Sequence, residues 1–161
     1  IMITDAAINI APDVETQIGI VENALPVARA LGVECPKVAV LSAVENVTDK
    51  MSSTVTAREI AERGVEGCVI SGPLALDGAI SMESVKHKAI KDPVAGRADI
   101  LLVPFIEIGN VLYKACSYIA GKTMASTICG ASCPVIITSR ADTPDSKYYS
   151  ILMAVLRCLK A

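Results

Sequence analysis

The chain has 161 residues, of which 52% are hydrophobic and 20% are charged. This length suits one domain, or one lobe of a larger protein, and the apolar content excludes an intrinsically disordered chain. Fifteen Lys and Arg against seventeen Asp and Glu leave a net charge of −2, and only 3% of the residues are aromatic. Since no basic block is present either, we expect neither nucleic acid nor a membrane surface as a partner.

The apolar residues form short runs. The longest, 100–106, is interrupted by Pro104 and is far shorter than the roughly 20 residues of a membrane-spanning helix. The first residues lack the basic segment and long apolar stretch of a signal peptide. Because the chain starts at Ile1, inside a strand-like segment, we expect further residues upstream.

Six cysteines, most of them within apolar runs, favour a reducing compartment such as the cytoplasm. In such runs we expect the thiols to pack as small hydrophobic core residues. Cys129 and Cys133 are the closest pair, and His87 is the sole histidine. This spacing does not favour a zinc site, and nothing near His87 indicates a catalytic role for it.

Strand-like and helical segments alternate along the chain. In chain order, the pattern predicts a strand over 1–8, a helix over 12–31, strands over 37–42 and 68–70, with a helix over 54–63 between them, a helix from Asp77 or Ser81 to Lys88, a strand over 98–103, a helix over 107–120, strands over 124–129 and 135–138, and a helix over 143–159. Pro12 suits the first turn of its helix, and Gly32 and Gly64 suit helix ends. Pro144, after Thr143, suits the start of the last helix.

The predicted strands are continuous apolar runs. Strands of this kind are buried on both faces, so we expect an α/β fold with a mostly parallel sheet and helices on both faces, a Rossmann-like three-layer sandwich. In such folds ligands bind beyond the carboxyl ends of the strands. Functional residues should therefore lie in the loops after Ser42, Ile70, Val103 and Thr138.

One candidate loop is Ser71-Gly72-Pro73, which follows a predicted strand. Gly72 permits a ligand to approach the backbone, and Pro73 stiffens the turn. Asp77 is placed to cap the next helix. The segment predicts either a substrate-binding loop or an ordinary strand-to-helix turn, and the residues alone favour the turn.

A second candidate is the start of the helix over 107–120. Gly109 and Asn110 could present backbone N–H groups to an anion there. The alternative is a capped helix without a ligand.

The third candidate, Ser139-Arg140, follows the predicted strand over 135–138. A guanidinium at a strand end suits bidentate phosphate binding, and the next helix points its amino end at the same loop. The alternative is a surface arginine. Asp142 and Asp145 follow, and either suits a general base or a favourable charge at the helix amino end.

Five segments stand in a distinctive order and spacing: 38–45, 71–77, 91–96, 98–104 and 109–114. Residues 4–9 and 138–142 extend the pattern across nearly the whole chain. Together they resemble the phosphotransacylase family of phosphate acetyl- and butyryltransferases, with more likeness to the butyryltransferases.

This resemblance implies reversible transfer of a short, butyryl-like acyl group between coenzyme A and inorganic phosphate, with no cofactor or metal. It implies a cytoplasmic, usually dimeric enzyme with a two-lobed α/β subunit and an active cleft between the lobes. Residues 1–161 correspond to the second lobe with the C-terminal helix, and the N-terminal lobe is not in this chain. We therefore expect the chain to fold but not to turn over alone.

The resemblance also implies roles for single residues. Ser139 would hydrogen-bond the reacting thiol or carbonyl, and Arg140 would hold phosphate and offset developing charge. The acetyl-transferring relatives place a base Asp six positions after that arginine; here Ser146 has that position, so Asp145 is the candidate base. The candidate substrate-binding residues are Ser71, Gly72, Pro73, Asp77, Gly109, Asn110 and Lys114.

Two other functions remain open. A non-catalytic module that binds coenzyme A or a nucleotide would use the same sheet edge. A lobe like that of the decarboxylating dehydrogenases would require a metal-binding cluster of carboxylates, which the sequence does not contain.

Overall fold

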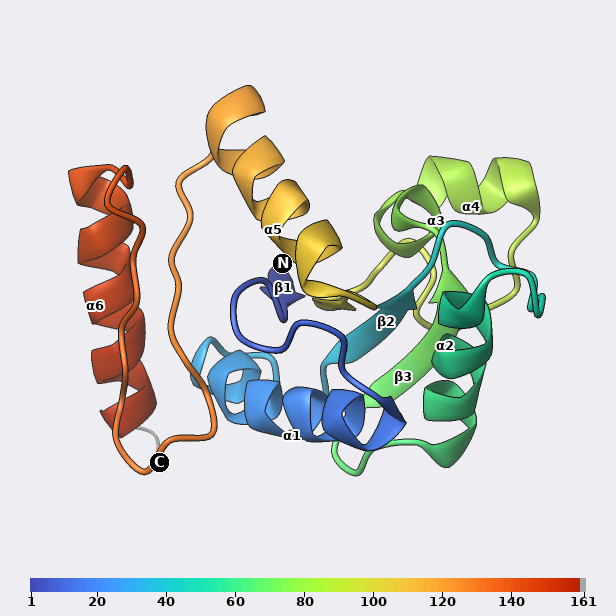
Figure 1. Cartoon of the computed structure of the whole chain (residues 1–161), viewed down its shortest axis with the longest axis horizontal. Coiled ribbons are helices and arrows are strands. Elements are labelled where there is room, and N and C mark those ends of the chain that lie inside the picture. Colours follow the sequence, from blue (N-terminus) through green and yellow to red (C-terminus); the bar gives the residue numbers. More distant parts are fainter. Residues whose placement is uncertain (160–161) are drawn as a thin grey trace.

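The computed structural model describes residues 1–159. A parallel sheet lies at its centre, with four strands in the order β1-β4-β2-β3 (Figure 1). The strands are β1 (Met2–Thr4), β2 (Lys37–Leu41), β3 (Val69–Leu74) and β4 (Ile100–Leu102). Because β1 and β3 form opposite edges, the loops that follow these two strands are far apart across the sheet.

Helices cover both faces of this sheet, which confirms the predicted α/β class. Alternate side chains of β2 point to opposite faces. Val38 and Val40 pack with α1 (Val14–Ala30) and α2 (Ser52–Arg63). Ala39 and Leu41 pack on the other face, where the covering helices are α3 (Leu76–Ile80), α4 (Met82–Lys88) and α5 (Ile106–Lys114). Each fully buried Val, Leu or Ile side chain of these layers stabilises the fold by about 1.5–3 kcal/mol.

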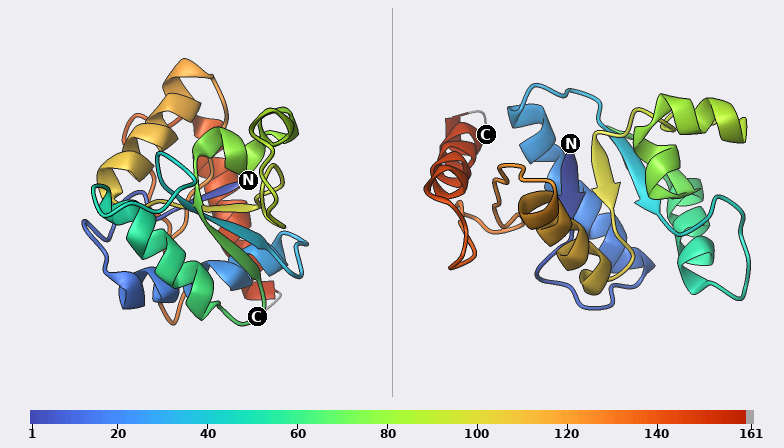
Figure 2. Two further views of the ribbon diagram at one scale, coloured as in Figure 1. Left: turned by 90° about the vertical axis from the view of Figure 1, so that its right-hand side faces the viewer. Right: turned by 90° about the horizontal axis from the view of Figure 1, so that it is seen from above.

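The last part of the chain leaves the sheet. After α5 comes a π-helical turn, η1 (Ala115–Ile119), and then an extended segment over 121–143 that we call the strap. The strap leads to α6 (Pro144–Leu159), which lies beside α1. Figures 1 and 2 show α6 at one end of the long axis and α4 near the other.

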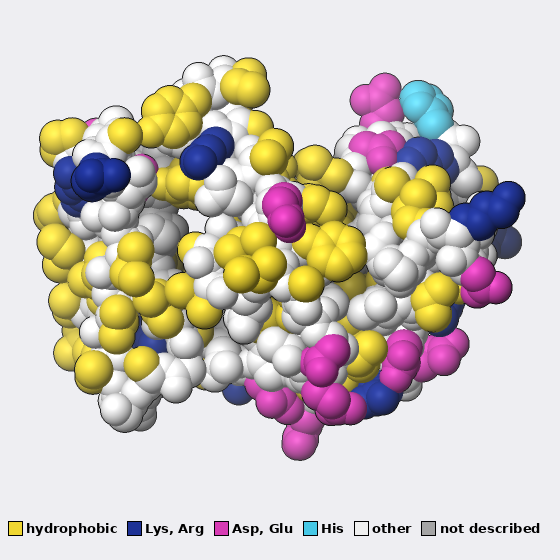
Figure 3. Space-filling view, in the orientation of Figure 1, with side chains coloured by type: hydrophobic (Ala, Val, Ile, Leu, Met, Phe, Trp, Pro, Cys, Tyr) yellow, Lys and Arg dark blue, Asp and Glu magenta, His cyan; other side chains and the backbone are white. Residues whose placement is uncertain are grey.

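Most of the surface of α6 is exposed. Within the helix only Ser146, Ser150 and Ala154 are buried. Large apolar side chains lie on its exposed surface: Tyr148, Tyr149, Ile151, Leu152, Val155 and Leu159. Figure 3 shows apolar side chains gathered over this end of the molecule.

Two predicted strands, over 124–129 and 135–138, are wrong. Both segments belong to the strap, which carries a single antiparallel bridge between Ile128 and Val135. The apolar runs there have no neighbouring strand to pair with. Side-chain hydroxyl groups instead donate to backbone carbonyls that a neighbouring strand would bind in a sheet. The Ser126 hydroxyl donates to the Ile137 carbonyl, and the Thr127 hydroxyl donates to the Val135 carbonyl.

Some predicted boundaries also change. The first strand ends at Thr4 instead of residue 8, because the Asp5 carboxylate turns the following backbone into a loop. Pro12 precedes the N-cap of α1, which is Asp13, instead of lying in the first turn. Strand β3 continues to Leu74, so Ser71-Gly72-Pro73 lies within a strand and not in a loop.

The prediction that the cysteines pack as core residues is wrong for most of them, although Cys68 packs against the core from its edge. All six are unpaired, and none is buried: Cys35, Cys133 and Cys158 are exposed, and Cys68, Cys116 and Cys129 are half-buried. Within residues 1–159, no helix is long and apolar enough to cross a bilayer.

Candidate functional site

A cavity of about 1110 Å³, which we call the larger cavity, lies along the β1 edge of the sheet. Its walls come from β1 and the loop after it, from α1 and α5, and from the strap and α6. The polar side chains in these walls include Asp5, Asn9, Asn110, Lys114 and Ser139. The cavity therefore combines residues from both ends of the chain.

Asp5 organises the loop after β1. Its carboxylate accepts hydrogen bonds from the N–H groups of Ala7, Ile8 and Asn9, at 2.8 to 3.0 Å, and from the Asn9 side-chain amide at 2.6 Å. Burial by itself would raise the pKa of Asp5, but these hydrogen bonds outweigh it and lower the pKa below its ordinary value. The ionised carboxylate is thus a structural centre of the loop.

Helix α5 packs closely on this loop at Gly109. A Cβ atom at Gly109 would lie 2.7 Å from the carbonyl oxygen of Asp5 and 2.8 Å from Cα of Ala6. The N–H group of Gly109 donates to the Phe105 carbonyl, so the prediction that it presents a free N–H to an anion is corrected. Glycine is needed here for close packing.

Asn110 and Lys114 extend from α5 to the cavity wall. The Asn110 side-chain amide donates to the Ala6 carbonyl at 3.4 Å, so it is held near the Asp5 loop. The Lys114 ammonium has no ion-pair partner among residues 1–159. This part of the cavity wall therefore offers one amide and one unpaired positive charge.

Ser139 and Arg140 lie where the strap approaches α6. Ser139 lines the larger cavity, and Arg140, next in the chain, is exposed. Arg140 makes no hydrogen bond or ion pair with any of residues 1–159, so its guanidinium is available to an anion. The sequence predicted a sheet strand directly before Ser139. The structure has the extended strap there instead.

The two positions considered for the general base differ in environment. Asp145 lies in the first turn of α6 and is exposed. Ser146 is buried, and its hydroxyl accepts a hydrogen bond from the Thr143 hydroxyl at 3.1 Å, while its N–H donates to the same oxygen atom at 3.2 Å. Thr143 thereby caps α6, as predicted. Ser146 is part of this cap, so Asp145 is the only one of the two open to a substrate.

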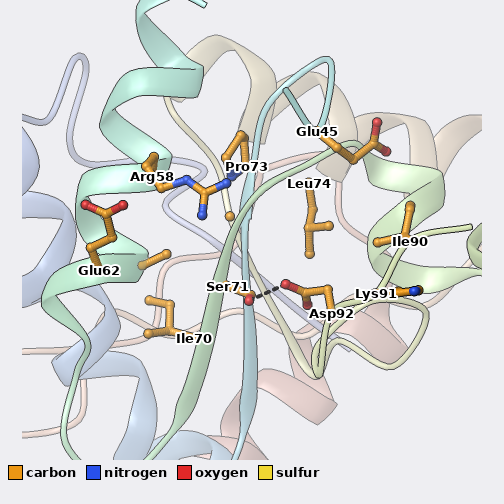
Figure 4. A pocket seen from close by; sticks show the side chains of 12 residues that line it. Glu45, Arg58, Glu62, Ile70, Ser71, Pro73, Leu74, Ile90, Lys91 and Asp92 are labelled. Atoms are coloured by element: carbon orange, nitrogen blue, oxygen red, sulfur yellow. Dashed lines mark hydrogen bonds between the residues drawn. The ribbon is translucent and has the colours of Figure 1, made fainter. Parts of the chain in front are cut away.

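A smaller cavity, of about 320 Å³, lies at the β3 edge (Figure 4). Ser71, Gly72 and Pro73 line it together with Arg58 and Asp92. The Ser71 hydroxyl donates to the Asp92 carboxylate at 2.5 Å. A Cβ atom at Gly72 would lie 2.8 Å from Cβ of Val40, so this glycine permits close packing between two strands. Both residues thus have structural partners within the fold.

Asp77 is engaged elsewhere on the surface. Its carboxylate accepts a hydrogen bond from the Lys88 ammonium at 2.9 Å, and this bond lowers the pKa of Asp77. It is the second residue of α3 and not an N-cap. Ser81, the alternative helix start, caps α4.

The structure therefore separates the residues that the sequence assigned to one site. It brings Asn110, Lys114 and Ser139 together at the larger cavity, with Arg140 beside it. Ser71, Gly72 and Pro73 line the other cavity, across the sheet. Neither of these two cavities is lined by residues of both groups.

Sequence reasoning missed Asp5 and Asn9. The strand predicted over 1–8 contains Asp5 and ends just before Asn9, so the pattern assigns these two side chains no role in a site. An Asp with an Asn four positions later, followed by Pro12, is a signal for a polar loop that closes on itself. That signal would have ended the strand at Thr4.

Neither a metal nor a reactive thiol is indicated at the cavity. Residues 1–159 contain no group of three His, Cys, Asp or Glu side chains that could hold a metal ion. Cys129 lines the larger cavity, and burial raises the pKa of its thiol. At neutral pH it is therefore protonated and a poor nucleophile.

Comparison with known proteins identifies the family. The sequence model described as "Phosphate acetyl/butaryl transferase" matches residues 1–155. The chain belongs to this family. It is 49% identical over 157 residues to a probable phosphate butyryltransferase of Bacillus subtilis, with 95% of this chain and 52% of that protein covered. It is 45% identical over 160 residues to a phosphate butyryltransferase of Clostridium acetobutylicum, with 97% of this chain and 53% of that protein covered.

A solved structure gives the same relationship. The branched-chain phosphotransacylase of Enterococcus faecalis superposes with a TM-score of 0.92 at 43% identity, covering 99% of this chain and 58% of that protein. The chain thus spans about half the length of the relatives it matches. Both relatives are transferases by name, and neither name supports the alternative of a non-catalytic binding module.

Proposed function

We propose that this chain forms one half of a phosphate acyltransferase, which converts acyl-CoA and phosphate to acyl phosphate and coenzyme A. The observation that carries this proposal is the Ser139-Arg140 pair: a cavity-lining hydroxyl followed by a guanidinium without a partner among residues 1–159. Family membership supports the same reaction.

The chemistry follows from charge. A phosphate oxygen attacks the thioester carbonyl carbon, the C–S bond breaks, and the sulfur leaves as a thiolate that takes up a proton. Arg140 holds the phosphate through paired hydrogen bonds, and Ser139 donates to the oxyanion that develops on the carbonyl oxygen. Lys114 adds a positive charge at the same cavity, and Asn110 adds an amide donor. In the reverse direction, Asp145 is the candidate base that takes the thiol proton.

The residues at the smaller cavity, and Asp77 elsewhere on the surface, have no place in this step as the fold positions them. For Ser71, Gly72, Pro73 and Asp77 to contact substrate, they would have to act at a surface completed by another lobe or subunit. We propose a homodimeric, cytoplasmic enzyme with a second α/β lobe. The six unpaired thiols support the reducing compartment, and the half-length match to the relatives supports the second lobe, while the dimer is what the family resemblance implies.

A chimera tests the activity. This chain would replace the matched 160-residue segment of the Clostridium acetobutylicum relative, with that parent enzyme as the positive control. We expect the chimera to form acyl phosphate from butyryl-CoA and phosphate, and the 161-residue chain alone to bind coenzyme A without turnover. A folded chimera that accepts no short acyl-CoA, acetyl-CoA included, would contradict the proposal.

A further inference from the structure

One carboxylate joins the Ser139-Arg140 loop to α5, a helix that packs on the sheet. The Tyr113 hydroxyl, on α5, donates to Oδ1 of Asp142 at 2.6 Å. The backbone N–H of Ser139 donates to Oδ2 of the same Asp142 at 2.6 Å. The carboxylate thus forms a bridge between α5 and Ser139, the residue that precedes Arg140.

No other hydrogen bond among residues 1–159 makes this connection. The remaining bonds of segment 138–142 are internal: the Asp142 N–H donates to the Ser139 carbonyl, and the Ala141 N–H to the Ser139 hydroxyl. Without the bond to Tyr113, the loop would be attached only through the strap and α6.

The bridge is of a strong type. Hydrogen bonds to an ionised carboxylate are shorter than neutral ones and about twice as strong. Burial and the bond to Asp142 raise the pKa of Tyr113 above its ordinary value, so its hydroxyl remains a donor at physiological pH. Tyr113 follows Asn110 by three positions, hence the helix that presents Asn110 to the cavity also holds the loop.

We propose that Asp142 is a positioning residue, which together with Tyr113 fixes Ser139 and Arg140 at the mouth of the larger cavity. Each of its carboxylate oxygens already accepts a hydrogen bond, and this occupancy assigns it an orienting role instead of that of the general base. The role of this bridge in phosphate binding rests on the proposed function. Its mechanical role, which is to hold the Ser139-Arg140 loop against α5, does not.

Limited proteolysis of the 161-residue chain tests the mechanical role. Trypsin cleaves after Arg140, so the rate at this bond reports how firmly the loop is held. We expect Tyr113→Phe and Asp142→Ala to speed this cleavage about tenfold, as the loss of a charge-assisted hydrogen bond predicts. Asp142→Asn should change it less, because its amide oxygen can still accept from Ser139 while its NH₂ donates to Tyr113. Cleavage after Arg63 serves as the internal control.

Kinetics of the chimera test the role in the reaction. Tyr113→Phe and Asp142→Ala should each raise the KM for phosphate more than they lower kcat. Asp142→Asn should keep most of the phosphate affinity that Asp142→Ala loses. The variant that combines Tyr113→Phe with Asp142→Ala should have a KM for phosphate no higher than that of Asp142→Ala alone. Unchanged cleavage after Arg140 in Tyr113→Phe would overturn the bridge itself. Faster cleavage with an unchanged KM for phosphate would overturn its role in binding, and an inactive parent chimera would count against the proposed function while the cleavage result still decides the bridge.

Discussion

Two charged side chains near the larger cavity differ in their hydrogen bonding. The Asp5 carboxylate accepts four hydrogen bonds from its own loop. The Arg140 guanidinium has no partner among residues 1–159. A satisfied carboxylate stabilises the fold, whereas an exposed, unpaired guanidinium contributes little to it and is free for a ligand. Substitutions at the two positions should therefore affect different properties.

Asp5→Ala should lower the free energy of unfolding by about 1–3 kcal/mol at neutral pH, because it removes the acceptor of three backbone N–H groups. The folded-state pKa of Asp5 is depressed, so this stabilisation is present above the unfolded-state pKa and is lost as the pH falls through the folded-state value. Urea unfolding at about pH 7 and about pH 3 measures both effects. An equal loss at both pH values would contradict the prediction.

Arg140→Ala should raise the KM for phosphate of the chimera by about 10- to 100-fold, since a bidentate, charge-assisted contact is lost. Arg140→Lys is the matched control, which keeps the charge but not the planar pair of donors. The stability of the chain should not change in either variant. Unchanged phosphate saturation in Arg140→Ala would remove this residue from the site.

At the scale of elements, the contact between α5 and the Asp5 loop depends on a missing side chain. Gly109 lies in helix α5, where glycine is unfavourable by itself, yet a Cβ there would meet backbone atoms of Asp5 and Ala6. Backbone atoms cannot move aside as the end of a flexible side chain can. The helix and the loop can therefore pack this closely only when position 109 has no side chain.

Gly109→Ala should destabilise the chain by about 1–3 kcal/mol through overpacking and should loosen the Asp5 loop. Gly19→Ala is the matched control, because Gly19 is also helical but its added Cβ would meet no atom within 4 Å. That substitution should stabilise the chain by about 0.5–1 kcal/mol. Thermal unfolding of both variants checks the pair, and the same sign for both would show that packing at Gly109 is not limiting.

Local signals predicted the helices well and one class of strand poorly. Gly64 ends α2 and Thr143 caps α6 as expected, because caps and terminal glycines act within a few residues. The apolar runs of the strap looked like strands, but a strand exists only when a neighbour supplies hydrogen bonds. The sequence pattern within 124–138 does not indicate that this segment lies against α6 instead of against the sheet.

At the scale of the whole molecule, α6 leaves most of its surface exposed, with only three buried residues. Tyr148, Ile151 and Val155 are each about half exposed, at 58%, 52% and 48%. They lie three and four positions apart, hence on one face. Continuous apolar surface of this kind usually meets a partner surface. We propose that its partner is the half of the relatives' length that this chain does not match.

Ile151→Ser combined with Val155→Ser should reduce the yield of assembled, active chimera several-fold, while the unfolding midpoint of the 161-residue chain changes little. The reason is that both side chains are exposed in the chain and contribute little to its own core. Val111→Ser, at an exposed position on α5, is the control for loss of an exposed apolar side chain. Equal yields for the double variant and the unsubstituted chimera would contradict this partner surface.

The sequence by itself determined the layered α/β architecture, most helix ends and the family, because apolar periodicity, caps and ordered motifs are properties of nearby residues. Only the tertiary structure decided which motifs share a cavity. The strand order β1-β4-β2-β3 places the Ser71 segment at one edge and the Asp5 loop, α5 and Ser139 at the other. Periodicity indicates which face of a strand is buried but not which strand lies beside it, so neither this separation nor the bond between Tyr113 and Asp142 could be predicted from local pattern.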